Sequence, residues 1–381
     1  MRIRLTALDT LFFRDGKPFN RGEETWANGI FPPPPSVLYG ALRSLYFTSN
    51  PKDIGKENTN NDPTNDLVIS DIQITSDDNL YYTCPLDVVI EKATQNTNNE
   101  NYLLLNLDKT KRITSSNLDY HLSVSDNLEV ETLDGYVSQS NFERKYLKGQ
   151  TPNDIFSLET FLTLEPKVGI GRDNNTHVSD EGLLYRVGMV RPESQNDKGQ
   201  FSKLNIEIEF DLKIWNLSIG DKGFIKLGGE AKSCSYEVIS SRKEVTIKSF
   251  SSDIFKIYFA TPTVFNNDKI NKKCYGWIPS FLDENLEGEW NGIKVKLLTA
   301  AIGKPKYLGG FDMKKRRPKP MIKMIPEGSV YYFKVIDKND IDKLKNLKQP
   351  FVLIDEDEQN TTRKSDKKSN QGFGLAYLSN I

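Results

Sequence analysis

Short runs in which apolar and polar side chains alternate restrict the fold of this chain more than any other feature. Two runs show the alternation clearly, one at the start and one in the middle: Ile3, Leu5 and Ala7, and then Ile206, Ile208, Phe210 and Leu212. A period of two places every second side chain on one face of a β-strand. Because long stretches with helical periodicity are scarce, the pattern predicts an α+β fold with antiparallel sheets rather than a doubly wound parallel sheet.

Further runs predict the remaining elements. Strands are expected at 67–75, 80–91, 254–261, 293–300, 330–336 and 351–354. The polar residues 76–79 predict a hairpin turn between the first two of these. Helices are expected at 37–45 and 341–347, and Ser36 offers an N-cap to the first. Gly40 lies inside that helix, where it allows close approach by a neighbouring backbone.

The length of the chain and two polar breaks predict two domains. At about 150 residues per domain, a chain of 381 residues corresponds to two domains or to one with large insertions. The Asn-rich stretch 93–101 cannot bury apolar surface and is expected to be a solvated loop. The polar stretch 193–199 is expected to separate the domains. The predicted domains are therefore 1–198 and 199–381.

The charges of the chain nearly cancel. The sequence has 51 Lys and Arg residues against 52 Asp and Glu residues, a formal net charge of −1. Any phosphate-binding site must therefore be a local patch rather than a property of the whole molecule. The chain contains no run of 18 apolar residues, and residues 1–5 lead into strand-like sequence without signal-peptide features. We expect a cytoplasmic protein that does not bind membranes.

Cysteine and histidine are too scarce and too scattered to predict a metal or redox site. The chain has three cysteines, Cys84, Cys234 and Cys274, and two histidines, His121 and His177. These numbers argue against a disulfide framework, zinc ligation and catalysis by a histidine pair. Each Gly-Lys pair is followed by Pro or Glu, which excludes a phosphate-binding P-loop. We expect no metal, no cofactor and no catalytic residue.

The segment from Lys167 to Arg186 predicts two strands joined by a long polar excursion. Gly169 and Gly171 allow close approach of the backbone to a ligand, and Lys167 and Arg172 can contact phosphates. One interpretation is a protruding nucleic-acid-binding finger. An ordinary hairpin is about as well supported by the spacing alone.

Two features near the C-terminus could also contact phosphates. The stretch 311–323 contains one acid and six cations: Lys314, Lys315, Arg316, Arg317, Lys319 and Lys323. It is either a phosphate contact or a solvated loop. In the turn formed by Gly372, Phe373 and Gly374, backbone amides could cradle phosphate oxygens and the aromatic ring could stack on a base. A Gly-x-Gly pattern is weak by itself.

Together these segments resemble a known family. The resemblance rests on residues 9–19, 31–34, 40–43, 227–230, 309–312, 318–321, 326–333 and 372–374. They resemble the third subunits of the Cmr complex, the type III-B CRISPR RNA-guided effector. These subunits belong to the RAMP superfamily of RNA-binding proteins. The resemblance spans nearly the whole chain.

The resemblance implies a fold and a role. The fold would be two ferredoxin-like, RNA-recognition-type domains, one of them degenerate, with a protruding thumb hairpin at about 166–190. The role would be non-catalytic: to grip the 5′ tag of the guide RNA in antiviral defence. The subunit would also contact the backbone RAMP subunit and dock the large polymerase-like subunit. The residues expected near RNA are Arg14, Lys17, Arg21, Lys167, Gly169, Gly171, Arg172, Lys314, Lys315, Arg316, Arg317, Gly372, Phe373 and Gly374.

Two other functions stay open at this point. A guide-processing endonuclease of the same superfamily would need a general acid and a general base at the scissile 2′-hydroxyl. A protein-docking module would instead turn its basic run toward an acidic partner.

Overall fold

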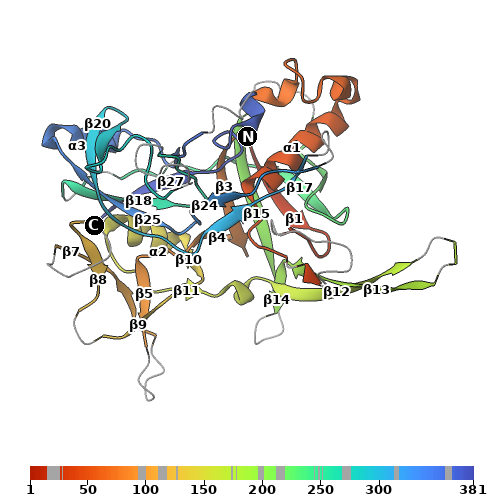
Figure 1. Ribbon diagram of the computed structural model, residues 1–381, viewed down its shortest axis with the longest axis horizontal. Helices are drawn as coiled ribbons and strands as arrows, with labels where there is room; N and C mark the ends of the chain where they lie inside the picture. Colours follow the sequence, from red (N-terminus) through yellow and green to blue (C-terminus); the bar gives the residue numbers. More distant parts are fainter. Residues whose placement is uncertain are drawn as a thin grey trace.

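Two large antiparallel sheets form the body of the molecule, and a long hairpin projects from it (Figure 1). The structure is a computed structural model. It describes residues 1–14, 26–27, 29–92, 100–109, 118–125, 128–172, 175–176, 178–195, 201–211, 219–243, 245–247, 249–250, 252–267, 276–312, 317–356 and 363–381. None of the helices in these ranges is long and apolar enough to cross a membrane.

The first sheet has nine strands. They are β1 (Arg2–Ala7), β3 (Val68–Ser76), β4 (Asn79–Thr83), β10 (Tyr136–Ser138), β11 (Ile155–Phe156), β14 (Glu193–Gln195), β15 (Phe201–Asp211), β16 (Lys222–Lys226) and β17 (Ser233–Ile239). The order is β11-β10-β4-β3-β15-β1-β17-β16, with β14 paired to β15. Because β15 is antiparallel to both β1 and β3, these two strands run in the same direction, and helix α1 (Pro35–Ser49) connects them. This is a split β-α-β unit.

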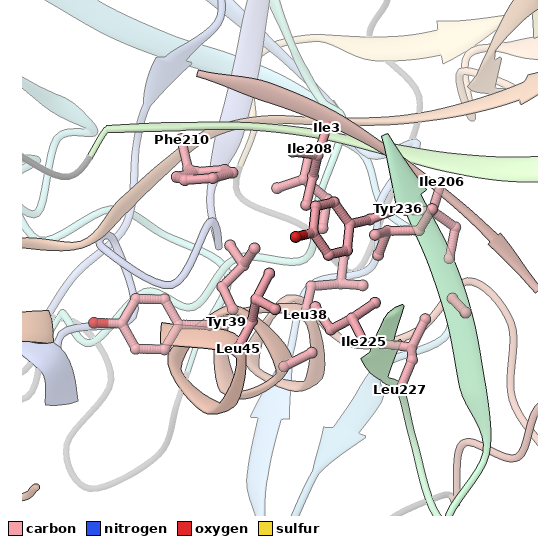
Figure 2. Close-up of a cluster of buried hydrophobic side chains, with 14 of the residues drawn as sticks. Ile3, Leu38, Tyr39, Leu45, Ile206, Ile208, Phe210, Ile225, Leu227 and Tyr236 are labelled. Carbon is pink, nitrogen blue, oxygen red and sulfur yellow. The ribbon is translucent and has the colours of Figure 1, made fainter. Parts of the chain in front are cut away.

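Helix α1 covers one face of this sheet. Its apolar side packs on side chains from β1, β15 and β17, as Figure 2 shows for Leu38 and Leu45 against Ile3 and Ile208. The helix begins at Pro35, where a proline needs no hydrogen-bond donor, so Ser36 is not the N-cap that the sequence predicts. A Cβ atom added at Gly40 would meet nothing within 4 Å, so no backbone approaches there.

The structure has the hairpin turn that the sequence predicts at 76–79, where Ser76 pairs with Asn79. Asp77 and Asp78 have φ angles of 48° and 61°, and two consecutive positive values are typical of a two-residue hairpin turn. The strand predicted at 80–91 is interrupted after β4 by Pro85. Its second half, β5 (Val88–Glu91), pairs instead with β6 (Tyr102–Leu104) and β9 (Val130–Thr132) in a separate small sheet.

The second sheet repeats the arrangement of the first. Its strands are β18 (Ile254–Phe259), β19 (Glu287–Trp290), β20 (Ile293–Ala301), β25 (Val330–Val335), β26 (Phe351–Val352) and β27 (Leu375–Asn380), in the order β19-β20-β25-β18-β27-β26. Thus β18, β20, β25 and β27 take the positions that β1, β3, β15 and β17 take in the first sheet. The described residues between β18 and β20 form no helix, whereas α3 (Ile341–Lys345) lies between β25 and β27.

The sheets divide the chain later than the predicted boundary at 198/199. Strands β15, β16 and β17 pair within the first sheet, which ends at Ile239, and the second sheet begins at Ile254. The polar break at 193–199 therefore lies inside the first unit, because pairing with β1 and β3 places β15 at the centre of its sheet.

Both faces of the second sheet are buried. On β18, Phe255 and Ile257 face a core formed by the C-terminal half of the chain. Tyr258 faces the opposite way, into a core shared with Tyr82 and Phe142 of the first unit. The alternation along one strand thus directs side chains into two different cores. The shared core joins the two units.

A buried ion pair crosses this junction. Asp87 precedes β5, Lys256 lies on β18, and both side chains are completely buried. Lys256 Nζ lies 3.2 Å from Asp87 Oδ2. The hydroxyls of Tyr146 and Tyr332 donate hydrogen bonds of 2.8 and 2.7 Å to the same carboxylate. Burial lowers the pKa of Lys256, and Asp87 opposes that change. The buried carboxylate of Asp87 thus has three partners, one ammonium group and two hydroxyls.

Removing one member of this pair is expected to destabilise the molecule strongly. Asp87→Ala leaves a buried ammonium group unpaired, which typically costs about 3–5 kcal/mol in the free energy of unfolding. Lys334→Met is a suitable control, because Lys334 is half-exposed and its ion pair with Asp253 is long, at 3.8 Å. That control should cost less than about 1 kcal/mol. Urea titrations of both variants measure the difference, and equal losses would contradict this role for Asp87.

Candidate nucleic-acid interface

A two-stranded hairpin projects from the body of the molecule (Figure 1). Strands β12 (Thr163–Arg172) and β13 (Ser179–Arg191) pair from Thr163 opposite Arg191 outward, with an irregularity between Ile170 and Arg172. Figure 1 shows this ribbon extending well beyond the two sheets. Strand β2 (Trp26–Ala27) runs parallel to β13 beside the hairpin. The two strands predicted between Lys167 and Arg186 are therefore present as one hairpin.

One face of β12 is apolar and open to solvent. Leu164, Val168 and Ile170 alternate along the strand and are exposed by 64, 57 and 55%. Lys167 belongs to the other set of alternating positions and lies opposite Val187, which is buried. The two faces of the hairpin therefore differ in chemistry. A search for period-two alternation within 163–172 could have found the apolar face, which the sequence analysis missed.

The base of the hairpin is fixed by the segment that follows β1 and by a glycine turn. Phe12 packs against Val187 and Met189 of β13. The Phe12 carbonyl accepts a hydrogen bond of 2.8 Å from the Gly229 amide. Gly228 has a φ of +81°, and a Cβ atom there would lie 2.5 Å from the same carbonyl oxygen. Only glycine fits this position, so the 228–230 segment is a structural turn.

Carboxylates neutralise several cations at the base of the hairpin. Lys167 Nζ lies 3.4 Å from a Glu230 oxygen. Arg191 contacts Glu165 at 2.6 Å, and this hydrogen bond raises the pKa of the arginine further. Lys232 lies 2.9 Å from Asp9, whose pKa it lowers by a hydrogen bond. A phosphate approaching Lys167 would therefore compete with Glu230.

Arg14 lies close to the same base. Its backbone forms a bridge with Gly29, and its side chain is exposed. A Cβ atom on Gly29 would lie 2.2 Å from the Gly188 carbonyl oxygen of β13, so the two backbones are in direct contact. The structure thus brings Arg14 to the strand pair that carries Lys167, Gly169, Gly171 and Arg172. Lys17 and Arg21 lie outside the described residues.

The C-terminal glycine turn lies elsewhere and is closely packed. The amides of Gly372, Phe373 and Gly374 donate to the carbonyls of Ser369, Lys368 and Pro262, at 3.2, 3.1 and 2.9 Å. The expected phosphate cradle is therefore not available, because its donors already have protein acceptors. The Phe373 ring is 1% exposed and packs with Val264 and Met324, so it presents no stacking face. The sequence could not reveal that Pro262, Val264 and Met324 lie against this turn, because these residues are distant in the chain.

The predicted basic run lies in the C-terminal half of the chain. Arg317 is exposed on β23 (Arg317–Pro318), which pairs with β22 (Phe311–Asp312). Lys314, Lys315 and Arg316 lie outside the described residues. Of the predicted RNA contacts, the structure therefore groups Arg14 with the hairpin, and it places Arg317 and the 372–374 turn in the other unit.

Both cysteines that the structure describes are buried. Burial raises the pKa of the Cys234 thiol to about 12 and that of Cys84 still further, so both stay protonated near neutral pH. Within the part of the chain that the structure describes, no group of three or more His, Cys, Asp or Glu residues could hold a metal ion. His121 lies on β8 (His121–Ser123), and His177 lies outside the described residues.

The fold is similar to that of a chain in solved structures of CRISPR effectors. One chain of the "Cryo-EM structure of the Type III-B Cmr-beta bound to cognate target RNA and AMPPnP, state 1" matches 91% of this chain and 89% of its own length, with a TM-score of 0.52 and 18% identity. A chain of the "Cryo-EM structure of the Type III-B Cmr-beta bound to cognate target RNA" has the same coverage and identity and a TM-score of 0.48. A chain of the "Crystal structure of Csm3-Csm4 subcomplex in the type III-A CRISPR-Cas interference complex" is more distant, with a TM-score of 0.35, 11% identity and coverages of 89% and 96%.

The family follows from the sequence itself. The family model for CRISPR-associated protein (Cas_Cmr3) matches residues 3–381, and the chain belongs to this family. It is thus a member of the Cmr family of type III CRISPR effector proteins. A search of curated proteins finds no similar sequence.

Two glycine substitutions should have opposite effects on stability. Gly374 has a φ of +72°, and a Cβ atom there would lie 2.7 Å from the Leu353 carbonyl oxygen. Gly374→Ala should therefore lower the free energy of unfolding by about 1–3 kcal/mol. Gly40→Ala, on the open side of α1, should raise it by about 0.5–1 kcal/mol. Chemical denaturation of both variants measures these changes. A neutral Gly374→Ala would show that the turn is not constrained.

Proposed function

We propose that this chain is a non-catalytic subunit that binds the 5′ tag of the guide RNA in a type III-B effector complex. In this proposal the two units are ferredoxin-like domains, and the β12–β13 hairpin is the thumb that positions the guide where tag meets spacer. The subunit would also dock the large polymerase-like subunit and a backbone RAMP subunit. Membership of the Cas_Cmr3 family and the shared strand order of the two sheets support this proposal.

The projecting hairpin is the observation that carries the proposal. Its strands form no part of either large sheet, and its apolar face, with Leu164, Val168 and Ile170, is open. A contiguous exposed apolar surface is typical of a binding site. Apolar side chains can contact unstacked bases, while cations such as Arg172 can contact phosphates. A hairpin with both kinds of side chain fits a role in bending and positioning a single-stranded RNA.

The proposed phosphate contacts lie on the hairpin or in the unit that carries it. Arg14 and Arg172 lie on the same unit as the hairpin, so they are the proposed phosphate contacts. Lys167 is a further candidate, and it would exchange Glu230, which lies 3.4 Å from its ammonium group, for a phosphate. Gly169 and Gly171 would let the RNA backbone approach the strand. Gly372, Phe373 and Gly374 would support the junction of the two units rather than contact RNA through their amides.

The absence of catalysis is also a proposal. The two buried thiols have raised pKa values, and the sequence has only two histidines. A ribonuclease mechanism at the 2′-hydroxyl needs an acid and a base in reach of one another. The endonuclease alternative therefore has little chemical support in this chain.

Replacement of Arg172 should weaken RNA binding without changing its sequence preference. For Arg172→Ala, we expect similar losses for guides with different spacers, because phosphate contacts carry little sequence information. The slope of log affinity against log salt should fall in magnitude by about 0.7, the value for one contact to a single strand. Arg172→Lys should retain most of the slope. Titrations of fluorescent guide RNA at several salt concentrations measure these quantities.

Lys338 provides the matched control for that experiment. It is an exposed cation beyond the last residue of β25, in the second unit. Lys338→Ala should leave both affinity and salt slope unchanged. An unchanged slope for Arg172→Ala, or an effect limited to one spacer sequence, would remove Arg172 from the proposed interface.

The purified chain should not cleave RNA. Incubation with repeat RNA, with and without divalent metal, is expected to leave the RNA intact, and gel electrophoresis measures this directly. Specific cleavage that disappears in His121→Ala or His177→Ala would instead support the endonuclease. The same preparation should bind the guide RNA, so that an inactive sample is not mistaken for a non-catalytic one.

A further inference from the structure

An apolar cavity, lined by the second unit and by Leu118, has no role in the proposed RNA site. It has a volume of about 330 Å³ and lies between the end of β20, the loop that follows it and β24 (Ile322–Met324). Its walls are mainly apolar and include Trp277, Ala300, Ile302, Pro305, Met324 and Pro326. This volume lies within the range of cavities that bind small ligands or single side chains.

Hydrogen bonds hold the walls of the cavity in place. The Tyr331 hydroxyl donates a bond of 2.6 Å to the carbonyl of Trp277. Ile325 exchanges two backbone hydrogen bonds with Thr263, at 2.8 and 3.0 Å. A cavity with fixed walls loses little conformational entropy when it is filled, which favours binding.

The surface around the cavity combines exposed apolar side chains with cations. Ile302, Tyr307 and Met321 are exposed by 37, 57 and 46%. Lys323 lines the cavity and lies directly opposite Tyr307 in the β21 (Lys306–Leu308) and β24 ladder. Lys304 is exposed between two residues that line the cavity.

These cations are not neutralised by neighbouring acids. Among the described residues, Lys304 and Lys323 form no ion pair, and the same holds for Arg317 and Lys319 on the adjoining hairpin. Lys306 differs, because its ammonium group contacts Glu327. The rim of the cavity is therefore positive, whereas its interior is apolar.

We propose that this cavity receives an aromatic or aliphatic side chain from an acidic segment of another protein chain. The positive rim fits the acidic residues, and the apolar walls fit the inserted side chain. A nucleobase fits less well. Among the described residues that line the cavity, only Lys323 and Trp277 have side chains with hydrogen-bonding groups. Most polar edges of a buried base would therefore lack partners, which is unfavourable. The inference rests on the proposed role as a subunit of a protein complex, but it does not depend on RNA binding.

Labelled synthetic peptides test the proposal on the full-length chain. The main probe carries one phenylalanine flanked on both sides by acidic residues. In one control peptide alanine replaces the phenylalanine, and in another lysines replace the acids. Fluorescence anisotropy should show binding of the acidic phenylalanine peptide. Loss of the phenylalanine should weaken it about tenfold or more, as expected for a buried aromatic side chain. The lysine-flanked peptide should not bind measurably.

Matched charge variants locate the binding to the cavity. Lys323→Glu should weaken the acidic peptide by about tenfold or more, because it replaces an attraction by a repulsion at the rim. Lys338→Glu changes the charge equally at an exposed site beyond the far end of β25 and should have no effect. Both residues are exposed, so neither change should unfold the chain. Ala300→Phe, which fills the cavity, should also abolish binding, with thermal melting as its folding control.

Several outcomes would overturn the inference. Absence of binding by the acidic phenylalanine peptide would do so, as would equal binding of the lysine-flanked peptide. An unstructured RNA oligonucleotide that binds with the same dependence on Lys323 would assign the surface to RNA instead. Guide-RNA titrations of Lys323→Glu keep the two proposals separate. Lys323→Glu should lose the peptide and keep the guide. Wild-type protein that binds guide RNA but not the acidic phenylalanine peptide overturns only the docking site, whereas wild-type protein that fails to bind guide RNA overturns the proposed function.

Discussion

The ion pair between Asp87 and Lys256 is the interaction on which the arrangement of the two units depends. It is completely buried in the core that both sheets share, and two tyrosine hydroxyls complete the hydrogen bonding of the carboxylate. Buried charges are tolerated only where each has its partner, so the pair favours one placement of the segment before β5 against β18. Because the second sheet is buried on both faces, its placement also positions the cavity and the C-terminal glycine turn.

The two units share one kind of hydrogen bond between a glycine turn and the segment after their first matched strand. In the first unit the glycine turn precedes β17, and its second glycine donates an amide hydrogen bond to a carbonyl that follows β1. In the second unit the turn precedes β27, and its second glycine donates to a carbonyl that follows β18. The pairs are Gly229 with Phe12 and Gly374 with Pro262, at 2.8 and 2.9 Å. The units differ in their helices, since the first keeps α1 after its first strand and the second keeps α3 before its last. One unit carries the hairpin, and the other carries the apolar cavity.

Sequence patterns predicted the local elements well and the contacts between them poorly. Strands β1, β15, β18, β20 and β25 and helices α1 and α3 lie where alternation or periodicity predicts them, because these patterns depend on neighbouring residues. The predicted boundary at 198/199 and the predicted stacking role of Phe373 were wrong, because both depend on residues that are distant in the chain. The partners of β15 are β1 and β3, and the neighbours of Phe373 are Val264 and Met324, all remote in the chain.

The sequence alone determined that this chain is strand-rich and that it belongs to the Cas_Cmr3 family. It also predicted a glycine-bearing hairpin at about 166–190, which the structure has at 163–191. Only the tertiary structure decided which acids lie beside which cations. Lys167 and Glu230 are 63 positions apart, yet their charges lie 3.4 Å from each other. Likewise, the apolar cavity draws its walls from residues 118, 276–277, 300–305 and 323–326. A charge or an apolar surface acts through its neighbours in space, and long-range strand pairing sets those neighbours.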